Sequence, residues 1–110
     1  MAVTVFTSDP EGLLRAIVAA IQGGRIRTWS CDADGDFTHT AGQWRRQAWL
    51  RPKSRADQLV FGILPPKGST LTKVVYGVFH GRFVEMLLTH FDERFSRVTA
   101  SALPTDDDVV

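Results

Sequence analysis

The stretch CDADGDFTH, residues 31–39, places three carboxylates, a thiol and an imidazole within nine residues. Carboxylates can hold calcium, and an imidazole beside a carboxylate can move protons. An EF-hand loop counted from Asp32 fails on spacing, because glycine stands at position four instead of six and Gln43 replaces the closing glutamate. Asp34-Gly35 instead predicts a two-residue hairpin turn, and no metal site is expected.

Pairing of the two strands about Asp34-Gly35 would place Asp32 opposite Phe37 and Ser30 opposite His39. In that register Asp32, Ser30 and His39 converge on one sheet face. His39 and Asp36 are therefore weak candidates for acid–base catalysis. A surface histidine beside threonines is the simpler interpretation of the same residues.

A second group of polar residues lies in FHGRF, residues 79–83. We expect a strand to change into a helix here, so that free amides at the helix start and the guanidinium of Arg82 face His80. Such a junction could hold a small anionic ligand at residues 80–82. His80 is also a weak catalytic candidate, and a meeting of His39 with His80 would suggest a small hydrolase. Capping or half-burial of His80 is the structural alternative.

A third candidate is the basic, aromatic segment QWRRQAWLRPKSR, residues 43–55. Strand alternation over 44–51 places Arg45, Trp49 and Arg51 on one face, opposite a more core-like set that includes Leu50. Such a face could stack on single-stranded nucleic acid, or it could be an interface between two copies of the chain. The net charge of +1 argues against a strong nucleic-acid binder, so a solvated or interface face is favoured.

Two helices are expected to position these residues. The first spans about 9–22, where Ser8 or Asp9 caps the start and Gly23-Gly24 ends it. The second is expected over 81–94. Its apolar residues lie nearly opposite those of 73–79 on a helical wheel, so 73–79 is predicted as a strand.

The remaining segments predict strands. These are 2–6, 25–31, 36–40, 44–51 ended by Pro52, a central strand 58–64, and a last strand near 95–101. The pattern leaves open whether 36–40 and 44–51 are separate or one bulged strand. We expect an α+β two-layer sandwich, with an antiparallel meander of four to six strands and both helices on one face. Residues 1–103 form a single domain, and 104–110 form an acidic, flexible tail.

The composition is that of a globular protein of 110 residues, 44% hydrophobic and 23% charged. The one cysteine, Cys31, cannot form an internal disulfide. The N-terminus has no signal-peptide pattern, and no apolar run is long enough to span a membrane. We expect a cytoplasmic protein without membrane association, and no cofactor motif is present.

The expected function is that of a small, soluble, non-catalytic interaction or ligand-binding domain that forms a homodimer. The candidate binding residues are Arg45, Trp49, Arg51, His80 and Arg82. One alternative is nucleic-acid binding through 44–55, and another is a small hydrolase using His39 or His80. The sequence does not specify a ligand or a pathway.

Overall fold

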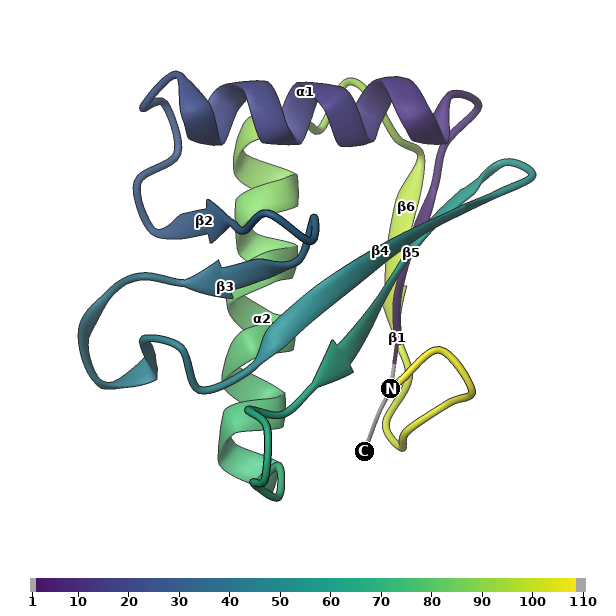
Figure 1. The fold of residues 1–110 in the computed structure, drawn as a ribbon. Helices are drawn as coiled ribbons and strands as arrows, with labels where there is room; N and C mark the ends of the chain where they lie inside the picture. Colours follow the sequence, from purple (N-terminus) through teal and green to yellow (C-terminus); the bar gives the residue numbers. More distant parts are fainter. Residues whose placement is uncertain (1, 109–110) are drawn as a thin grey trace.

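The computed structural model describes residues 2–108. The elements in chain order are β1 (Ala2–Phe6), α1 (Pro10–Gln22), β2 (Trp29–Cys31), β3 (Phe37–His39), the short 3₁₀ helix η1 (Gly42–Trp44), β4 (Trp49–Arg55), β5 (Gln58–Leu64), α2 (Lys73–His90) and β6 (Arg97–Ala100). The predicted α+β fold with an antiparallel sheet and two helices is confirmed (Figure 1).

The described strands form one six-stranded sheet in the order β2-β3-β4-β5-β1-β6. Each neighbouring pair is antiparallel. The chain meanders from β2 to β5, and the first and last strands then add at the β5 edge. The apolar strand β5 lies between β4 and β1, so the prediction that 58–64 is a central strand is confirmed. Its two covered faces explain the continuous apolar run.

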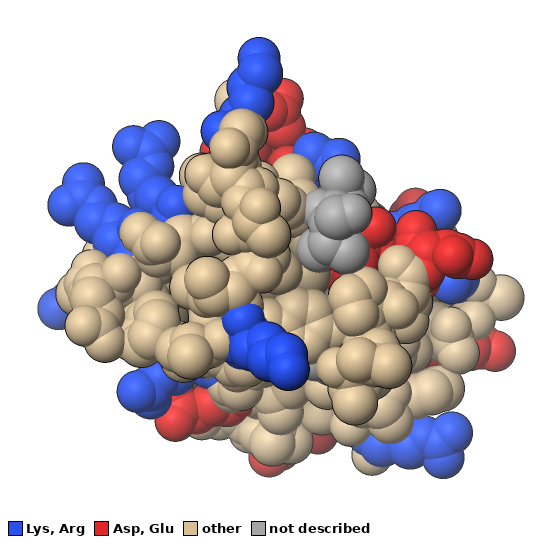
Figure 2. Space-filling view, turned by 90° about the horizontal axis from the view of Figure 1, so that it is seen from below, with Lys and Arg blue, Asp and Glu red and all other residues tan. Residues whose placement is uncertain are grey.

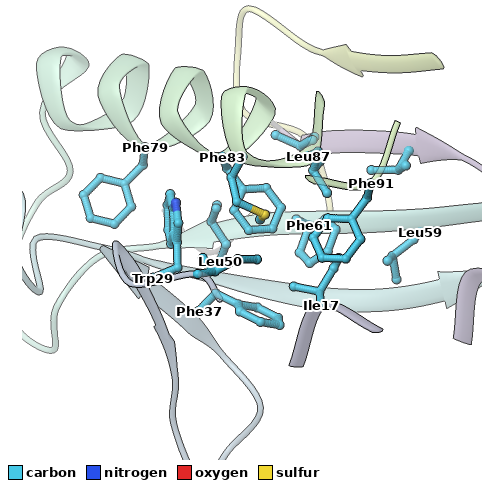
Figure 3. Packing of buried hydrophobic residues seen from close by; sticks show 14 of the residues in the cluster. Ile17, Trp29, Phe37, Leu50, Leu59, Phe61, Phe79, Phe83, Leu87 and Phe91 are labelled. Atoms are coloured by element: carbon cyan, nitrogen blue, oxygen red, sulfur yellow. The ribbon is translucent and has the colours of Figure 1, made fainter. Parts of the chain in front are cut away.

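The hydrophobic core lies between the sheet and the two helices, and Figure 3 shows the part of it beneath α2. Phe83 of α2 is at its centre, and its ring lies 5.0 Å from Trp29 and 4.5 Å from Phe61, measured between centroids. These pairs meet edge to face, which is the arrangement that the charge distribution of aromatic rings favours. Both helices therefore pack on the same face of the sheet.

The first helix begins and ends as its sequence predicts. The Asp9 carboxylate accepts a hydrogen bond from the Gly12 amide at 3.1 Å, and Pro10 occupies the first helical turn. Its buried stripe is Leu13, Ile17 and Ala20, at the spacing of one helical face. In Figure 1 the helix α1 lies across the upper end of the sheet.

The second helix differs from the prediction, because α2 begins at Lys73 and the segment 73–79 is helical instead of a strand. One stripe runs through the whole helix: Phe79, Phe83 and Leu87 are buried at intervals of four residues. Val74, which suggested a second apolar face, is 63% exposed. Val74 thus faces solvent, whereas Val75 is half-buried against the core, and tertiary packing of the apolar stripe outweighs the strand preference of these β-branched residues.

The hairpin between β2 and β3 has a register one residue away from the predicted one. Trp29 pairs with His39 and Ser30 with Thr38. The cause is the turn, in which the Asp32 carboxylate accepts hydrogen bonds from the amides of Asp34 and Asp36 at 2.9 and 3.0 Å. A one-residue shift moves every side chain to the other face. The predicted register, and with it the pairing of Ser30 with His39, is therefore wrong.

The segment 44–51 is also not the predicted strand. Residues up to 48 form η1 and a turn, and β4 begins at Trp49 and continues through Pro52. Only Leu50 of β4 pairs with β3, opposite Phe37, so β3 and β4 are separate strands. Pro52 lies beyond this pairing, where its missing amide hydrogen breaks no ladder bond to β3.

The described part of the segment expected to be a flexible tail contacts the sheet. The Asp107 side chain forms an ion pair with Arg55, and Asp108 accepts a hydrogen bond from the Ile63 amide at 2.8 Å. Residues 109–110 lie outside the described range. Neither helix found within residues 2–108 has the length and apolar character needed to cross a bilayer.

Candidate functional site

A cavity of about 640 Å³ lies between the C-terminal half of α2 and the loop that follows β3. We call it the α2 pocket, and its main polar and aromatic lining residues are His39, Trp44, Arg82, Glu85, Thr89 and His90. Its size suits a small molecule, and its few polar groups converge on one space.

His39 is the most deeply buried polar residue of the α2 pocket, with 6% of its surface exposed. Its Nδ1 atom accepts a hydrogen bond from the Ala41 amide at 3.2 Å, which requires Nδ1 to be unprotonated. Burial lowers the pKa of His39 below its ordinary value, and the nearby charge of Arg82 lowers it further, whereas Glu85 opposes the shift. His39 is therefore a neutral ring at physiological pH.

The opposite wall of the pocket is a polar stripe on α2. Arg82 and Glu85 form an ion pair at 3.6 Å, with side chains 54% and 65% exposed. A pair this exposed is screened by water and contributes little to stability. Arg82 can therefore exchange Glu85 for the anionic group of a ligand at small cost.

The β3–β4 loop supplies the aromatic wall. Gly42 has a φ of 59°, which glycine adopts without strain, and η1 then presents the half-buried Trp44. The loop is anchored at both ends. The Thr40 hydroxyl donates to the Arg27 carbonyl at 2.8 Å, and the Arg46 amide donates to the His39 carbonyl at 3.3 Å. The position of Trp44 is thus fixed by the same hairpin that buries His39.

A smaller hollow of about 340 Å³ lies on the face of the sheet away from the helices. We call it the Trp49 groove, and it is lined by Ser30, Asp32, Thr38, Thr40, Arg45, Arg46 and Trp49, with His39 at its margin. It brings together two of the predicted binding residues, Arg45 and Trp49. Trp49 is half-buried, so one part of its indole is covered by the sheet surface.

Arg51 does not line the Trp49 groove; it binds Asp36. Its Nε and Nη2 atoms donate to the two Asp36 carboxylate oxygens at 3.0 and 2.9 Å. The Asp36 side chain is 5% exposed, and this pair satisfies both of its oxygens. The catalytic candidate Asp36 and the binding candidate Arg51 thus have a shared structural role.

His80 lies apart from the α2 pocket. Its Nδ1 atom is 2.6 Å from the Tyr76 carbonyl oxygen, and its ring stacks on Tyr76 at 4.5 Å between centroids. The preceding residue, Phe79, is the one that contacts the His39 ring. Successive helical side chains diverge by about 100°, so His39 and His80 do not share a site.

Sequence reasoning missed Trp44, Glu85 and His90 as members of one pocket. A signal was present on α2, where Arg82, Glu85, Thr89 and His90 recur at helical spacing as one polar stripe. Nothing in the sequence indicated which loop would face that stripe.

Within residues 2–108, no three His, Cys, Asp or Glu side chains come close enough to hold a metal ion. The described residues thus form the α2 pocket and, separately, the basic, aromatic Trp49 groove. Comparison of the chain with protein-family models, curated proteins and solved structures finds no match.

Proposed function

We propose that the protein is a small non-catalytic binding domain whose ligand occupies the α2 pocket. The observation that carries the proposal is that Arg82 on α2 and Trp44 on the β3–β4 loop line one cavity above the buried, neutral His39. A cation and an aromatic wall suit a small molecule with an apolar ring and an anionic group.

The reading of the pocket as non-catalytic is supported by the partners of the catalytic candidates. His39 already accepts the Ala41 amide, Asp36 binds Arg51, and His80 lies elsewhere on α2. A general base must be within reach of the proton that it removes. Glu85 and His90, the other groups of the pocket that could exchange protons, are exposed on α2, whereas His39 is buried.

A titration followed by NMR tests the proposal with benzoate as the probe and uncharged benzamide as its matched control. We expect benzoate to shift the Trp44 indole and the amides of 41–43, and benzamide to bind more weakly. Arg82→Gln should weaken benzoate binding about tenfold or more, because a charge-assisted hydrogen bond contributes about 1.5–3 kcal/mol. Arg15→Gln, on the exposed face of α1, is the control variant.

Two results would contradict the proposal. One is a set of benzoate shifts that leaves the loop and α2 unaffected. The other is equal loss of binding in the Arg82 and Arg15 variants, since this would point to a nonspecific charge effect.

A second candidate function is single-strand nucleic-acid binding in the Trp49 groove, supported by the meeting of Arg45, Arg46 and Trp49 there. The net charge of +1 argues against a strong binder, and on the face shown in Figure 2 basic and acidic side chains are scattered over a largely uncharged surface. Oligonucleotide titration at low and high salt tests it. Binding that weakens with salt and is lost in Arg45→Ala would favour this candidate.

Self-association is the third candidate function, and like the second it would use the outer face of the sheet. It is supported by Trp49, an aromatic residue only half-buried on a sheet face that no helix covers. Sedimentation equilibrium of the wild type and Trp49→Ala tests it: a dimer that the substitution dissociates would make this face the interface.

A further inference from the structure

The segment Thr105–Asp108 lies against the outer face of β5, on the side of the sheet away from the helices. Its closest approach is at Gly62, where a Cβ atom would lie 1.8 Å from the Asp107 carbonyl oxygen. Real Cβ atoms do not come this near a backbone oxygen, so only glycine at position 62 lets the segment reach the sheet.

Two neighbouring carboxylates hold this segment. The Asp107 carboxylate, 15% exposed, pairs with the Arg55 guanidinium. The Asp108 Oδ1 atom accepts the Ile63 amide hydrogen at 2.8 Å, one of the main-chain donors of β5. The sheet thus offers one guanidinium and one amide at the spacing of consecutive aspartates.

The segment meets the sheet as a turn. The Asp108 amide donates to the Thr105 carbonyl at 3.0 Å, and the Thr105 amide donates to Asp108 Oδ2 at 2.8 Å. These bonds tie Asp108 to Thr105 within the turn and hold the same carboxylate that accepts from the Ile63 amide.

The surface beneath is apolar at its centre and basic at its side. Val60 is 2% exposed, although it is not part of the core cluster on the helix side. Arg51, Lys53 and Arg55 follow on alternate positions of β4 and are all exposed. This face complements an acidic segment in charge.

We propose that this face, which we call the Gly62 face (Arg55, Gly62, Ile63 and the neighbouring Lys53), is a docking surface for an acidic, turn-forming segment of a partner protein. The chain's own Thr105–Asp108 occupies it until a partner displaces it. A competing carboxylate can reach this ion pair from the Arg55 side, because the Arg55 side chain is 44% exposed, whereas Asp107 is 15% exposed. A partner segment with consecutive aspartates forms the same bonds.

A labelled peptide with the sequence SALPTDDD, residues 101–108, tests the proposal by fluorescence anisotropy. In the full chain carrying Asp107→Asn and Asp108→Asn, the chain's own segment should bind the Gly62 face more weakly. This double variant should bind the peptide about tenfold or more tightly than the wild type does, and salt should weaken the binding. A peptide with its last two aspartates replaced by asparagine should not bind.

Arg55→Gln in the same double variant should abolish peptide binding, whereas Arg97→Gln, on the far strand β6, should not. If the double variant fails to fold, the wild-type chain still tests the proposal. A spin-labelled peptide at millimolar concentration should then broaden the amides of 55 and 62–63. The proposal is overturned if neither form of the chain binds the peptide, or if the asparagine peptide binds equally well.

Discussion

The indole of Trp29 and the imidazole of His39 lie directly opposite each other on β2 and β3, with ring centroids 5.1 Å apart and planes at 81°. This pair turns His39 away from solvent and toward the core. The same pairing places the His39 backbone where it can anchor the loop that carries Trp44. The floor and the aromatic wall of the α2 pocket thus depend on one strand register.

The burial of His39 predicts a specific pH dependence of stability. Its pKa is lowered from 6.5, so below that pH the unfolded chain binds a proton that the folded protein does not. The stability associated with the neutral ring is complete above about pH 6.5 and falls as the pH drops toward the lower pKa of the folded state. Urea unfolding between about pH 7.5 and 5.5 measures this loss.

His39→Gln should show a smaller loss of stability across that range, and His90→Gln, at an exposed position of α2, is the matched control. If the free energy of unfolding changed with pH in the same way for the wild type and His39→Gln, folding would not lower the pKa of His39, and the prediction would be contradicted.

Phe83→Ala should be among the most destabilising substitutions in the chain. The ring is fully buried among Trp29, Phe37 and Phe61, so its removal leaves a cavity, at a cost of about 3–5 kcal/mol. Leu88→Ala on the same helix removes a side chain that is 53% exposed and should cost less than about 0.5 kcal/mol. Chemical denaturation measures both, and similar losses would contradict the packing of α2.

Asp36→Asn tests the ion pair beneath the outer face. The variant loses the bidentate bond to Arg51, and we expect a loss of about 1–2 kcal/mol, because Arg51 remains half-exposed to water. Asp34→Asn, in the same turn and exposed, should change the free energy of unfolding little. If both substitutions lowered the free energy of unfolding equally, the negative charge of the turn, and not the Asp36–Arg51 ion pair, would account for the loss.

Substitution of alanine for glycine should change the free energy of unfolding in opposite directions at two positions. A Cβ at Gly77 of α2 meets nothing within 4 Å, so Gly77→Ala should raise the free energy of unfolding by about 0.5–1 kcal/mol. Gly35 has a φ of 84°, so Gly35→Ala should lower it by about 1 kcal/mol through strain in the turn. Thermal melts of both variants check the contrast. A destabilising Gly77→Ala would argue that 73–79 is not helical in solution.

The elements with strong local signals were predictable from sequence. The Asp9 cap, the stripe of α1 and the closing glycines define that helix without reference to the rest of the chain. The apolar run of β5 likewise predicts a strand covered on both faces. The class of fold follows from these elements and the turns between them.

The start of α2 was mispredicted because its local preference and its tertiary role disagree. The β-branched residues of 73–79 favour a strand, but Phe79 belongs to the same buried apolar stripe as Phe83 and Leu87. Burial of that stripe outweighs preferences of a few tenths of a kcal/mol per residue.

The sequence by itself determined the α+β class, α1, the central strand β5 and the position of the acidic turn. Only the tertiary structure decided which residues share a site. The Asp32 carboxylate set the turn and shifted the register by one residue, which turned His39 inward. Packing then brought the β3–β4 loop against α2. The register depends on which turn residues 32–36 adopt, and the packing of the loop depends on contacts between distant segments; the sequence pattern specified neither.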